Sequence, residues 1–164
     1  MRKILGVDPG KSGGLSIIDE QLNLIATYPM PTIKVDGKDK VCPQGIQEIL
    51  SKHDIELAVV ELVGARPGQG VVSMFSFGDS YGVARALAEI HAAKVIYARP
   101  QQWRGFQSLT GLSKEQVAEV AFNVFRAPEI YGRARKDGAR PVRDGISDSL
   151  MIAKYGLRYL DASC

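Results

Sequence analysis

The stretch KILGVDPGKSGG, residues 3–14, decides the fold of this chain. Its first half is an apolar run that ends on Asp8, and its second half supplies turn residues. The apolar pattern resumes in LSIIDE (residues 15–20) and alternates through QLNLIATYPM (residues 21–30). We therefore expect three consecutive strands joined by turns, an antiparallel meander, rather than a strand that enters a helix.

Helical patterns alternate with two further apolar runs after this meander. PQGIQEILSKH (residues 43–53) has helical spacing and begins with Pro, and IELAVVEL (residues 55–62) is near-continuously apolar. VVSMFSFGDSYGVARALAEIHAA (residues 71–93) has a long helical pattern, and KVIYAR (residues 94–99) follows it as a strand. A continuous apolar run is typical of a parallel strand buried on both faces, so we expect the fourth strand to be central.

Three more helices are expected in the C-terminal half. PQQWRGF (residues 100–106) begins with Pro, LSKEQVAEVAFNVF (residues 112–125) contains a capping box, and ISDSLMIAKYGLRYL (residues 146–160) is amphipathic. This order predicts an α/β fold: a mixed five-stranded sheet, made of a three-strand antiparallel meander plus two parallel strands, with helices on both faces. We expect a single domain over residues 1–164.

Four acidic residues lie where a metal-dependent nuclease needs them. Asp8 and Glu61 end two of the apolar runs, and Asp144 and Asp148 stand four residues apart at the start of the last helix. Strand ends and one helical face can bring carboxylates to a single point, where they repel one another unless protons or cations intervene. Hard divalent cations with oxygen ligands are the usual answer, so metal-assisted phosphoryl chemistry is the leading hypothesis.

Three of the four acids also have a purely structural interpretation. Asp8 before Pro-Gly is common turn chemistry, and Asp144 could be the N-terminal cap of the last helix. Asp148, expected in the first turn of that helix, could have the purely structural role of a favourable interaction with the helix dipole. Glu61 is harder to explain in this way, because a carboxylate at the end of LAVVE is costly to bury without a partner. The four positions together favour a metal site.

Two polar segments are expected to be irregular. TIKVDGKDKV (residues 32–41) has a turn signal at its centre and is predicted to be an exposed loop. Residues 126–145 are rich in Arg, Gly and Pro, and we predict a mobile loop there. Clustered basic residues bind phosphate, and this loop directly precedes the acidic helix, so it is expected to contact DNA. Its candidate DNA-binding residues are Arg133, Arg135, Lys136, Arg140 and Arg143.

The composition permits nucleic-acid binding without requiring it. The chain has 164 residues, a net charge of +3 and a pI near 8.9. Its start lacks a signal-peptide pattern, and no apolar run reaches the length of a membrane span. Cys42 and Cys164 have no metal-ligand spacing and are expected to be reduced thiols. We therefore expect a cytoplasmic protein, of a bacterium or a phage-infected bacterium, with no membrane partner.

The order of elements, with carboxylates on the first strand, the fourth strand and the last helix, resembles the ribonuclease H-like fold. Within that superfamily the chain resembles the RuvC family of Holliday-junction resolvases, especially small phage-type members. LGVDPG is similar to the first motif of the family and LAVVE to the second. FGDSYGVARALA resembles its glycine-punctuated helix, LSKEQV its lysine-bearing segment, and SDSLMIA its final acidic helix. The match runs in register over almost the whole chain.

The resemblance implies catalytic roles for acids and for nearby basic residues. Asp8, Glu61 and Asp148 fall on the catalytic acidic positions of the family, whereas Arg104 and Lys114 fall near or on basic residues at the DNA-facing rim of its active site. We expect Lys114 to act in catalysis as well as in DNA binding. Two Mg²⁺ ions per active site, replaceable by Mn²⁺, would be held by Asp8, Glu61, Asp144 and Asp148.

The partners implied are four-way branched DNA and a second copy of the chain. Resolution of a four-way junction needs two symmetric cuts, for which a two-fold homodimer is the natural assembly. The family pairs its subunits at the glycine-punctuated helix, where Gly78 and Gly82 would allow close approach. Trp103 is expected to be a packed anchor rather than a platform for base stacking. Arg66, in the GARPGQG loop, is a further candidate for DNA contact.

Two positions depart from the pattern of the family. The usual fourth acid lies three residues before the last one, where this chain has Gly145, and Asp144 lies one residue earlier. An aromatic residue that shortly follows the strand-four acid in bacterial resolvases is replaced here by Gly64. The resemblance therefore does not extend to the mode of branch-point recognition or to the preferred cleavage sequence.

Other functions could use the same features. A ribonuclease acting on RNA–DNA hybrids would use this fold and these acids as a monomer, and a non-catalytic junction-binding protein would not depend on the acids. A transposase core usually needs additional DNA-binding domains, and an actin-like ATPase needs two domains, for which 164 residues are too few. The leading expectation is an endonuclease that cuts four-way and other branched DNA by two-metal hydrolysis and leaves 5′-phosphate and 3′-hydroxyl ends.

Overall fold

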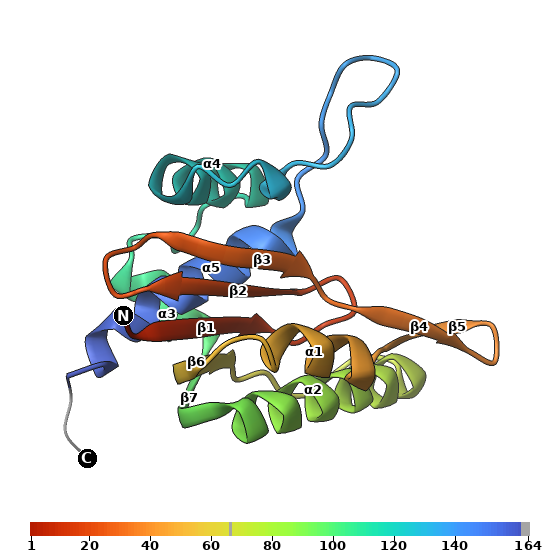
Figure 1. Cartoon of the computed structure of the whole chain (residues 1–164). Helices are drawn as coiled ribbons and strands as arrows, with labels where there is room; N and C mark the ends of the chain where they lie inside the picture. The colour runs from red at the N-terminus through yellow and green to blue at the C-terminus, as the bar shows by residue number, and fades with distance from the viewer. Residues whose placement is uncertain (66, 162–164) are drawn as a thin grey trace.

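The centre of the computed structural model, which describes residues 1–65 and 67–161, is a five-stranded sheet (Figure 1). Its strands are β1 (Lys3–Asp8), β2 (Gly14–Asp19), β3 (Leu24–Pro29), β6 (Ile55–Glu61) and β7 (Ala92–Ala98). They lie in the order β3-β2-β1-β6-β7. β1, β2 and β3 pair antiparallel, whereas β6 is parallel to both β1 and β7. The predicted meander and pair of parallel strands are confirmed.

Helices cover both faces of this sheet. One face is covered by α1 (Pro43–Leu50) and α2 (Val71–His91), and the other by α3 (Pro100–Phe106), α4 (Lys114–Phe125) and α5 (Asp144–Gly156). Successive β1 residues show the division, because Ile4 packs with the α5 side and Leu5 with the α2 side. Short 3₁₀ turns follow at η1 (Pro128–Ile130) and η2 (Leu157–Tyr159). None of the described helices is long and apolar enough to cross a membrane.

Helix α5 lies unusually close to the sheet because small residues face each other across the contact. A Cβ atom added to Gly6 would lie 2.0 Å from the carbonyl oxygen of Ser149, and one added to Gly14 would lie 2.5 Å from that of Gly145. The hydroxyls of Ser16 and Ser149 are hydrogen-bonded at 2.6 Å in the same contact. Backbone therefore packs against backbone, which fixes the start of α5 above the β1–β2 turn.

Residues 32–41 are largely exposed, as predicted, but the prediction that they form an irregular loop is wrong. They form a two-stranded hairpin of β4 (Thr32–Val35) and β5 (Lys38–Val41). Asp36 and Gly37 both adopt positive φ, 49° and 73°, as a two-residue hairpin turn requires. Lys34 and Asp39 face each other across the hairpin at 3.2 Å. Turn chemistry and cross-strand pairing thus outweigh the polar composition.

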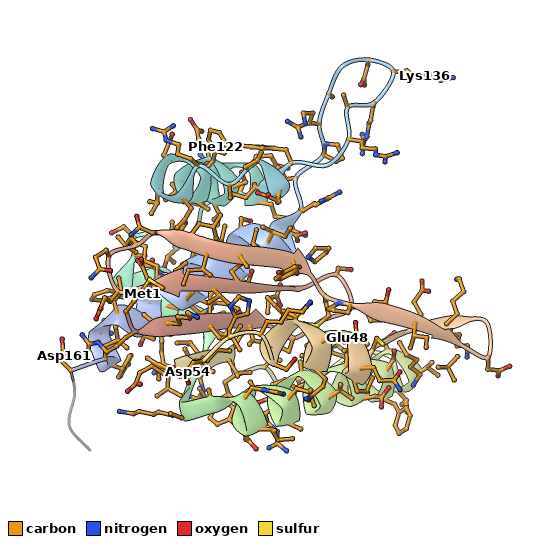
Figure 2. All side chains as sticks on the ribbon, in the orientation of Figure 1. Met1, Glu48, Asp54, Phe122, Lys136 and Asp161 are labelled. Carbon is orange, nitrogen blue, oxygen red and sulfur yellow. The ribbon has the colours of Figure 1, made fainter. Side chains whose placement is uncertain are left out.

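The basic segment after α4 forms a protruding loop with its own internal hydrogen bonds. It leaves the body through a bridge between Tyr131 and Val142 and turns back where Arg135 N–H donates to Ala139 O at 2.8 Å. Figure 2 shows Lys136 at its tip, far from the sheet. In Figure 1 the loop rises above α5, whereas the β4–β5 hairpin extends to the right of the sheet. The predicted mobility of this loop stays a prediction.

Candidate active site

The topology brings two acids to one edge of the sheet. β1 and β6 are parallel neighbours with Val7 opposite Val60, so Asp8 and Glu61 are the next residues along the two strands. Both end their strands, and the carboxyl ends of parallel strands share one edge. The parallel register therefore places the two carboxylates side by side, although they lie far apart in the sequence.

Helix α5 adds the other two acids from the neighbouring layer. Asp144 is its first residue and Asp148 its fifth, so the two side chains lie one turn apart on one helical face. The N-cap is Arg143, which makes no side-chain capping bond, and Asp148 lies beyond the first turn. The alternatives in which Asp144 caps the helix and Asp148 serves its first turn are therefore wrong. The close packing of α5 on the β1–β2 turn holds both acids near Asp8.

The ionisation of these groups shows that they form one electrostatic cluster. Burial raises the pKa of Asp8 well above its usual value, and the charges of Glu61, Asp148 and Asp144 raise it further, in that order. Burial likewise raises the pKa of Asp148 to about 6, against the opposing effect of the Arg104 guanidinium. The four predicted acids are thus brought together, and their charges disfavour the ionisation of Asp8 and Asp148.

Two of the predicted basic residues lie inside this cluster. The ammonium group of Lys114 forms an ion pair with the Asp144 carboxylate, which raises the pKa of Lys114. The Arg104 guanidinium donates to both carboxylate oxygens of Asp148, with Nη2 at 3.3 and 3.1 Å. The two acids of α5 are therefore each neutralised by a cation from a different element, α4 or α3.

The donor set fits a hard divalent cation in its chemistry. All four acids offer oxygen ligands, and their mutual repulsion is what a cation between them would relieve. As placed, however, no three acidic, His or Cys side chains among the described residues surround one point in the way an ion requires. Asp144 and Asp148 instead bind Lys114 and Arg104. An ion would have to compete with these two basic side chains.

Trp103 is a member of the site that sequence reasoning placed only in the core. Its ring is fully buried, which confirms the predicted packed anchor, but its indole N–H also donates to Glu61 Oε1 at 3.0 Å. The Arg104 guanidinium carbon lies 4.7 Å from the centre of the same ring. In the sequence, only the position of Trp103 could have indicated this role, because it directly precedes Arg104 on the helix that follows β7.

The missing fourth acid of the family pattern has a steric explanation. A Cβ atom at Gly145 would lie 2.2 Å from the Ser12 carbonyl oxygen and 2.4 Å from the Gly13 carbonyl carbon. No side chain fits there while α5 packs in this way, so an acid at that position is excluded. Asp144, one residue earlier, remains partly exposed, with its side chain 34% accessible.

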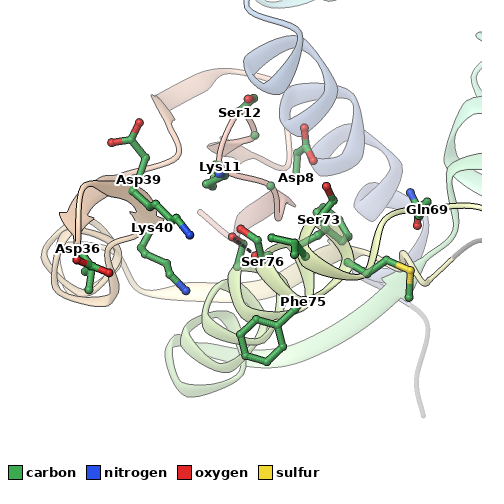
Figure 3. A pocket seen from close by; sticks show the side chains of 18 of the residues that line it. Asp8, Lys11, Ser12, Asp36, Asp39, Lys40, Gln69, Ser73, Phe75 and Ser76 are labelled. Atoms are coloured by element: carbon green, nitrogen blue, oxygen red, sulfur yellow. Dashed lines mark hydrogen bonds between the residues drawn. The ribbon is translucent and has the colours of Figure 1, made fainter.

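A groove leads from the acids between the hairpin and the start of α2. It encloses about 880 Å³ and is lined by the β1–β2 turn, the β4–β5 hairpin and the first turns of α2, with Asp8 and Asp144 at one end. Figure 3 shows Asp8 beside α5, across the groove from Asp39 and Lys40 on the hairpin. Lys40 binds Asp79 of α2 at 2.7 Å, which ties the hairpin to the helix. The cluster is therefore open to a ligand larger than an ion.

The other candidate DNA-binding residues lie outside the acidic cluster. Arg133, Arg135 and Lys136 are exposed on the protruding loop, and Arg143 immediately precedes α5. Arg140 instead donates to the carbonyl oxygens of Gly132 and Tyr131 at 2.9 and 3.2 Å, so it holds the loop in shape. Arg66 and Cys164 lie outside the described residues.

Helix α2 presents an apolar surface that the rest of the described chain leaves open. Val71, Val72 and Phe75 are each more than 75% exposed. Cβ atoms added to Gly78 and Gly82 would meet nothing within 4 Å. The close approach expected at these two glycines does not occur within the described part of one chain.

The sequence and the fold are both similar to known resolvases. No family model matches the chain. The crossover junction endodeoxyribonuclease RuvC of Polaromonas naphthalenivorans is 24% identical over 144 residues, which cover 82% of this chain and 78% of the relative. The structure of Thermus thermophilus RuvC in complex with a Holliday junction substrate superposes with a TM-score of 0.63 at 19% identity, covering 96% of each chain. The yeast mitochondrial Holliday junction resolvase Ydc2 gives a TM-score of 0.51 at 13% identity, over 97% of this chain and 79% of the other. The chain is therefore similar in sequence to a RuvC endodeoxyribonuclease and shares the fold of the solved RuvC-type resolvases.

Proposed function

We propose that this chain is a structure-specific endodeoxyribonuclease that cuts four-way DNA junctions, and other branched DNA, by hydrolysis of a phosphodiester bond. The observation that carries the proposal is the convergence of four carboxylates, of which three raise the pKa of Asp8, next to Arg104 and Lys114 and beside an open groove. The similarity to a RuvC relative and to a resolvase solved with its junction supports this substrate.

We propose a divalent-metal site made by Asp8, Glu61, Asp144 and Asp148, with two Mg²⁺ ions as the natural occupants and Mn²⁺ as a substitute. When bound, such ions generate a nucleophile from water and stabilise the charge that develops on the leaving oxygen. Asp8 lies centrally, because its pKa responds to all three other acids. Water oxygen would bond to phosphorus while the bond from phosphorus to the 3′ oxygen breaks. The products would carry 5′-phosphate and 3′-hydroxyl ends.

The basic residues have a defined part in this scheme. Lys114 and Arg104 hold Asp144 and Asp148 in the absence of other cations. If cations held these carboxylates instead, Lys114 and Arg104 would be available to bind a phosphate next to the acids. There they would neutralise the charge of the transition state. The exposed Arg133, Arg135 and Lys136 would contact phosphates further along the DNA.

We also propose a homodimer, formed through the exposed apolar surface of α2. Val71, Val72 and Phe75 would be buried in it, and Gly78 and Gly82 would let the two helices approach closely. A two-fold pair would present two active sites, as two symmetric cuts require. The whole chain would act as one domain, in the cytoplasm of a bacterium or of a phage-infected bacterium.

The test is incubation with labelled four-way, three-way and linear DNA and with an RNA–DNA hybrid, each with and without Mg²⁺. The proposal predicts paired cuts in the four-way DNA that need the metal, and products that a DNA ligase can rejoin. Cleavage of the hybrid alone would instead identify a ribonuclease of the same fold. Binding of four-way DNA without any cut, in Mg²⁺ or Mn²⁺, would identify a non-catalytic junction-binding protein.

A further inference from the structure

We propose that Trp103 is a positioning residue of the metal site, which fixes Glu61 directly and Asp148 through Arg104. This inference rests on the proposed metal-dependent function and deepens it. The starting observation is the hydrogen bond from the indole N–H to Glu61 Oε1 at 3.0 Å. A buried Trp ring needs a partner for its one N–H group, and here that partner is a candidate metal ligand.

The indole is held more firmly than the carboxylate that it contacts. Its ring is fully buried within the core on the α5 face of the sheet. The backbone carbonyl oxygen of Trp103 accepts a hydrogen bond from Gln107 Nε2 at 3.1 Å. The same Gln107 nitrogen donates to the backbone oxygen of Met151 on α5 at 2.9 Å. The buried ring is therefore held by core packing on a helix that is tied to α5. Glu61 ends its strand, and its carboxylate meets the indole N–H in the rotamer that the structure shows.

The same ring also supports the second carboxylate. The guanidinium carbon of Arg104 lies 4.7 Å from its centre, and Arg104 Nη2 donates to both oxygens of Asp148. Trp103 thus contacts Glu61 at its edge and supports the partner of Asp148 at its face. One buried side chain sets the positions of two acids that come from β6 and from α5.

This arrangement predicts an effect on metal affinity. A ligand that accepts a hydrogen bond from a fixed donor is oriented before the ion arrives, and loss of such a donor typically costs about 10–100-fold in metal affinity or activity. The effect should be specific to the N–H group. The size and shape of the ring serve packing, whereas its one N–H group serves Glu61.

The chain offers a direct spectroscopic readout, because Trp103 is its single tryptophan. Bound Mn²⁺ is paramagnetic and should quench the emission of an indole in contact with its ligand. Titration of the unmodified protein with Mn²⁺, in the absence of DNA, should therefore give a saturable loss of fluorescence that Mg²⁺ reverses by competition. Glu61→Gln should weaken the quenching.

The decisive comparison replaces the indole without changing its shape. Since the chain has one tryptophan, growth of an auxotroph on benzothienylalanine would exchange this N–H for sulfur and nothing else. The affinity of the benzothienylalanine protein for Mn²⁺ should be about 10–100-fold weaker than that of the tryptophan protein. Electron paramagnetic resonance, which reports the concentration of free Mn²⁺, measures both affinities. Trp103→Phe should do the same and should regain cleavage as Mn²⁺ is raised. Phe125→Leu, a core change on α4, is the control, and it should lower stability without altering Mn²⁺ affinity.

The outcomes separate the two proposals. If the unmodified protein binds no Mn²⁺, the metal site itself is wrong. If it binds Mn²⁺ and the benzothienylalanine and Trp103→Phe forms bind with the same affinity, the metal site stands and the positioning role of Trp103 is refuted. If Phe125→Leu weakens binding as much as Trp103→Phe, the effect belongs to core packing and the positioning role is again refuted.

Discussion

Helices α5 and α2 cover opposite faces of the same sheet and differ in almost every other respect. Ten of the thirteen residues of α5 are buried, whereas only three of the twenty-one residues of α2 are. Both helices carry glycines, but Gly145 and Gly156 of α5 are in close contact with the sheet and the β1–β2 turn, whereas Gly78 and Gly82 of α2 face open space. Within the described chain, a helical glycine therefore allows a close approach at α5, whereas at α2 the close approach depends on the homodimer that we propose.

This difference matches the roles that we propose for the two faces. The helix that carries the proposed catalytic acids is held closely against the sheet, because its backbone rests on β1 and β2. The helix that would meet a second copy needs little support from its own chain beyond the packing of residues such as Ala84 and Ala88. The same type of substitution should therefore have opposite consequences on the two helices.

The largest difference is expected between Gly145→Ala and Gly78→Ala. The first places a Cβ atom 2.2 Å from the Ser12 carbonyl oxygen, and the second meets nothing within 4 Å. Gly145→Ala should cost about 1–3 kcal/mol or more in unfolding free energy and should also abolish cleavage by displacing the α5 acids. Gly78→Ala should stabilise the isolated chain by up to about 1 kcal/mol, because Ala is the better helix former. Thermal unfolding at low protein concentration checks both, and equal effects would refute the comparison.

Within α5, the two acids should differ in importance. Asp148→Asn removes a partly buried carboxylate whose pKa is raised to about 6, and cleavage should be lost. Asp144 lies at the more exposed start of the helix and pairs with Lys114, so Asp144→Asn should leave a residual rate that higher Mn²⁺ partly restores. Single-turnover cleavage of four-way DNA at several Mn²⁺ concentrations measures both. Stability losses without any loss of cleavage would show that both acids are structural.

On α2, charge introduced into the apolar surface should act on assembly alone. Val72→Glu with Phe75→Glu changes two side chains that are each 76% exposed, so the fold of one chain loses no packing. Sedimentation should show a monomer where the parent is a dimer, and paired cutting should become single nicks. Glu in place of the exposed Ile90, at the far end of the same helix, is the matched control and should change neither. A parent that is already monomeric would remove the proposed role of this surface.

The smallest effect is expected in the loop that leads into α5. Arg133, Arg135 and Lys136 are exposed, so neutralising all three should leave the thermal midpoint nearly unchanged. Each lost phosphate contact should lower the log–log salt slope of junction binding by about one unit. Neutralising Lys52, which is exposed after α1, is the control. An unchanged salt slope in the triple variant would make this loop a bystander.

Apolar patterns were sufficient to predict the sheet, because buried strands such as KILGVD and IELAVVE have few alternatives. They also predicted the convergence of Asp8 and Glu61, which follows from the parallel pairing of strands whose carboxyl ends meet. The β4–β5 hairpin was missed because its stability comes from the Asp36–Gly37 turn and cross-strand pairs rather than from burial. A polar composition alone resembles that of a loop.

Features that depend on side-chain contacts between distant elements were not predictable. The bond between Trp103 and Glu61 joins α3 to β6, and spacing in the sequence carries no sign of it. The pairing of Asp144 with Lys114 depends on how α4 lies against α5. The steric reason for Gly145 likewise appears only once the β1–β2 turn and α5 are in contact.

The most direct test of the central claim is single-turnover cleavage and binding of four-way DNA by Asp8→Asn in Mg²⁺. Asp8 is central to the acidic cluster, and its charge is disfavoured by burial and by the other three acids. Removal of that charge should reduce cleavage at least about 100-fold, leave junction binding unchanged or tighter, and raise the thermal midpoint of the metal-free protein. A variant that binds the junction and cuts it at the rate of the parent would contradict the proposed active site.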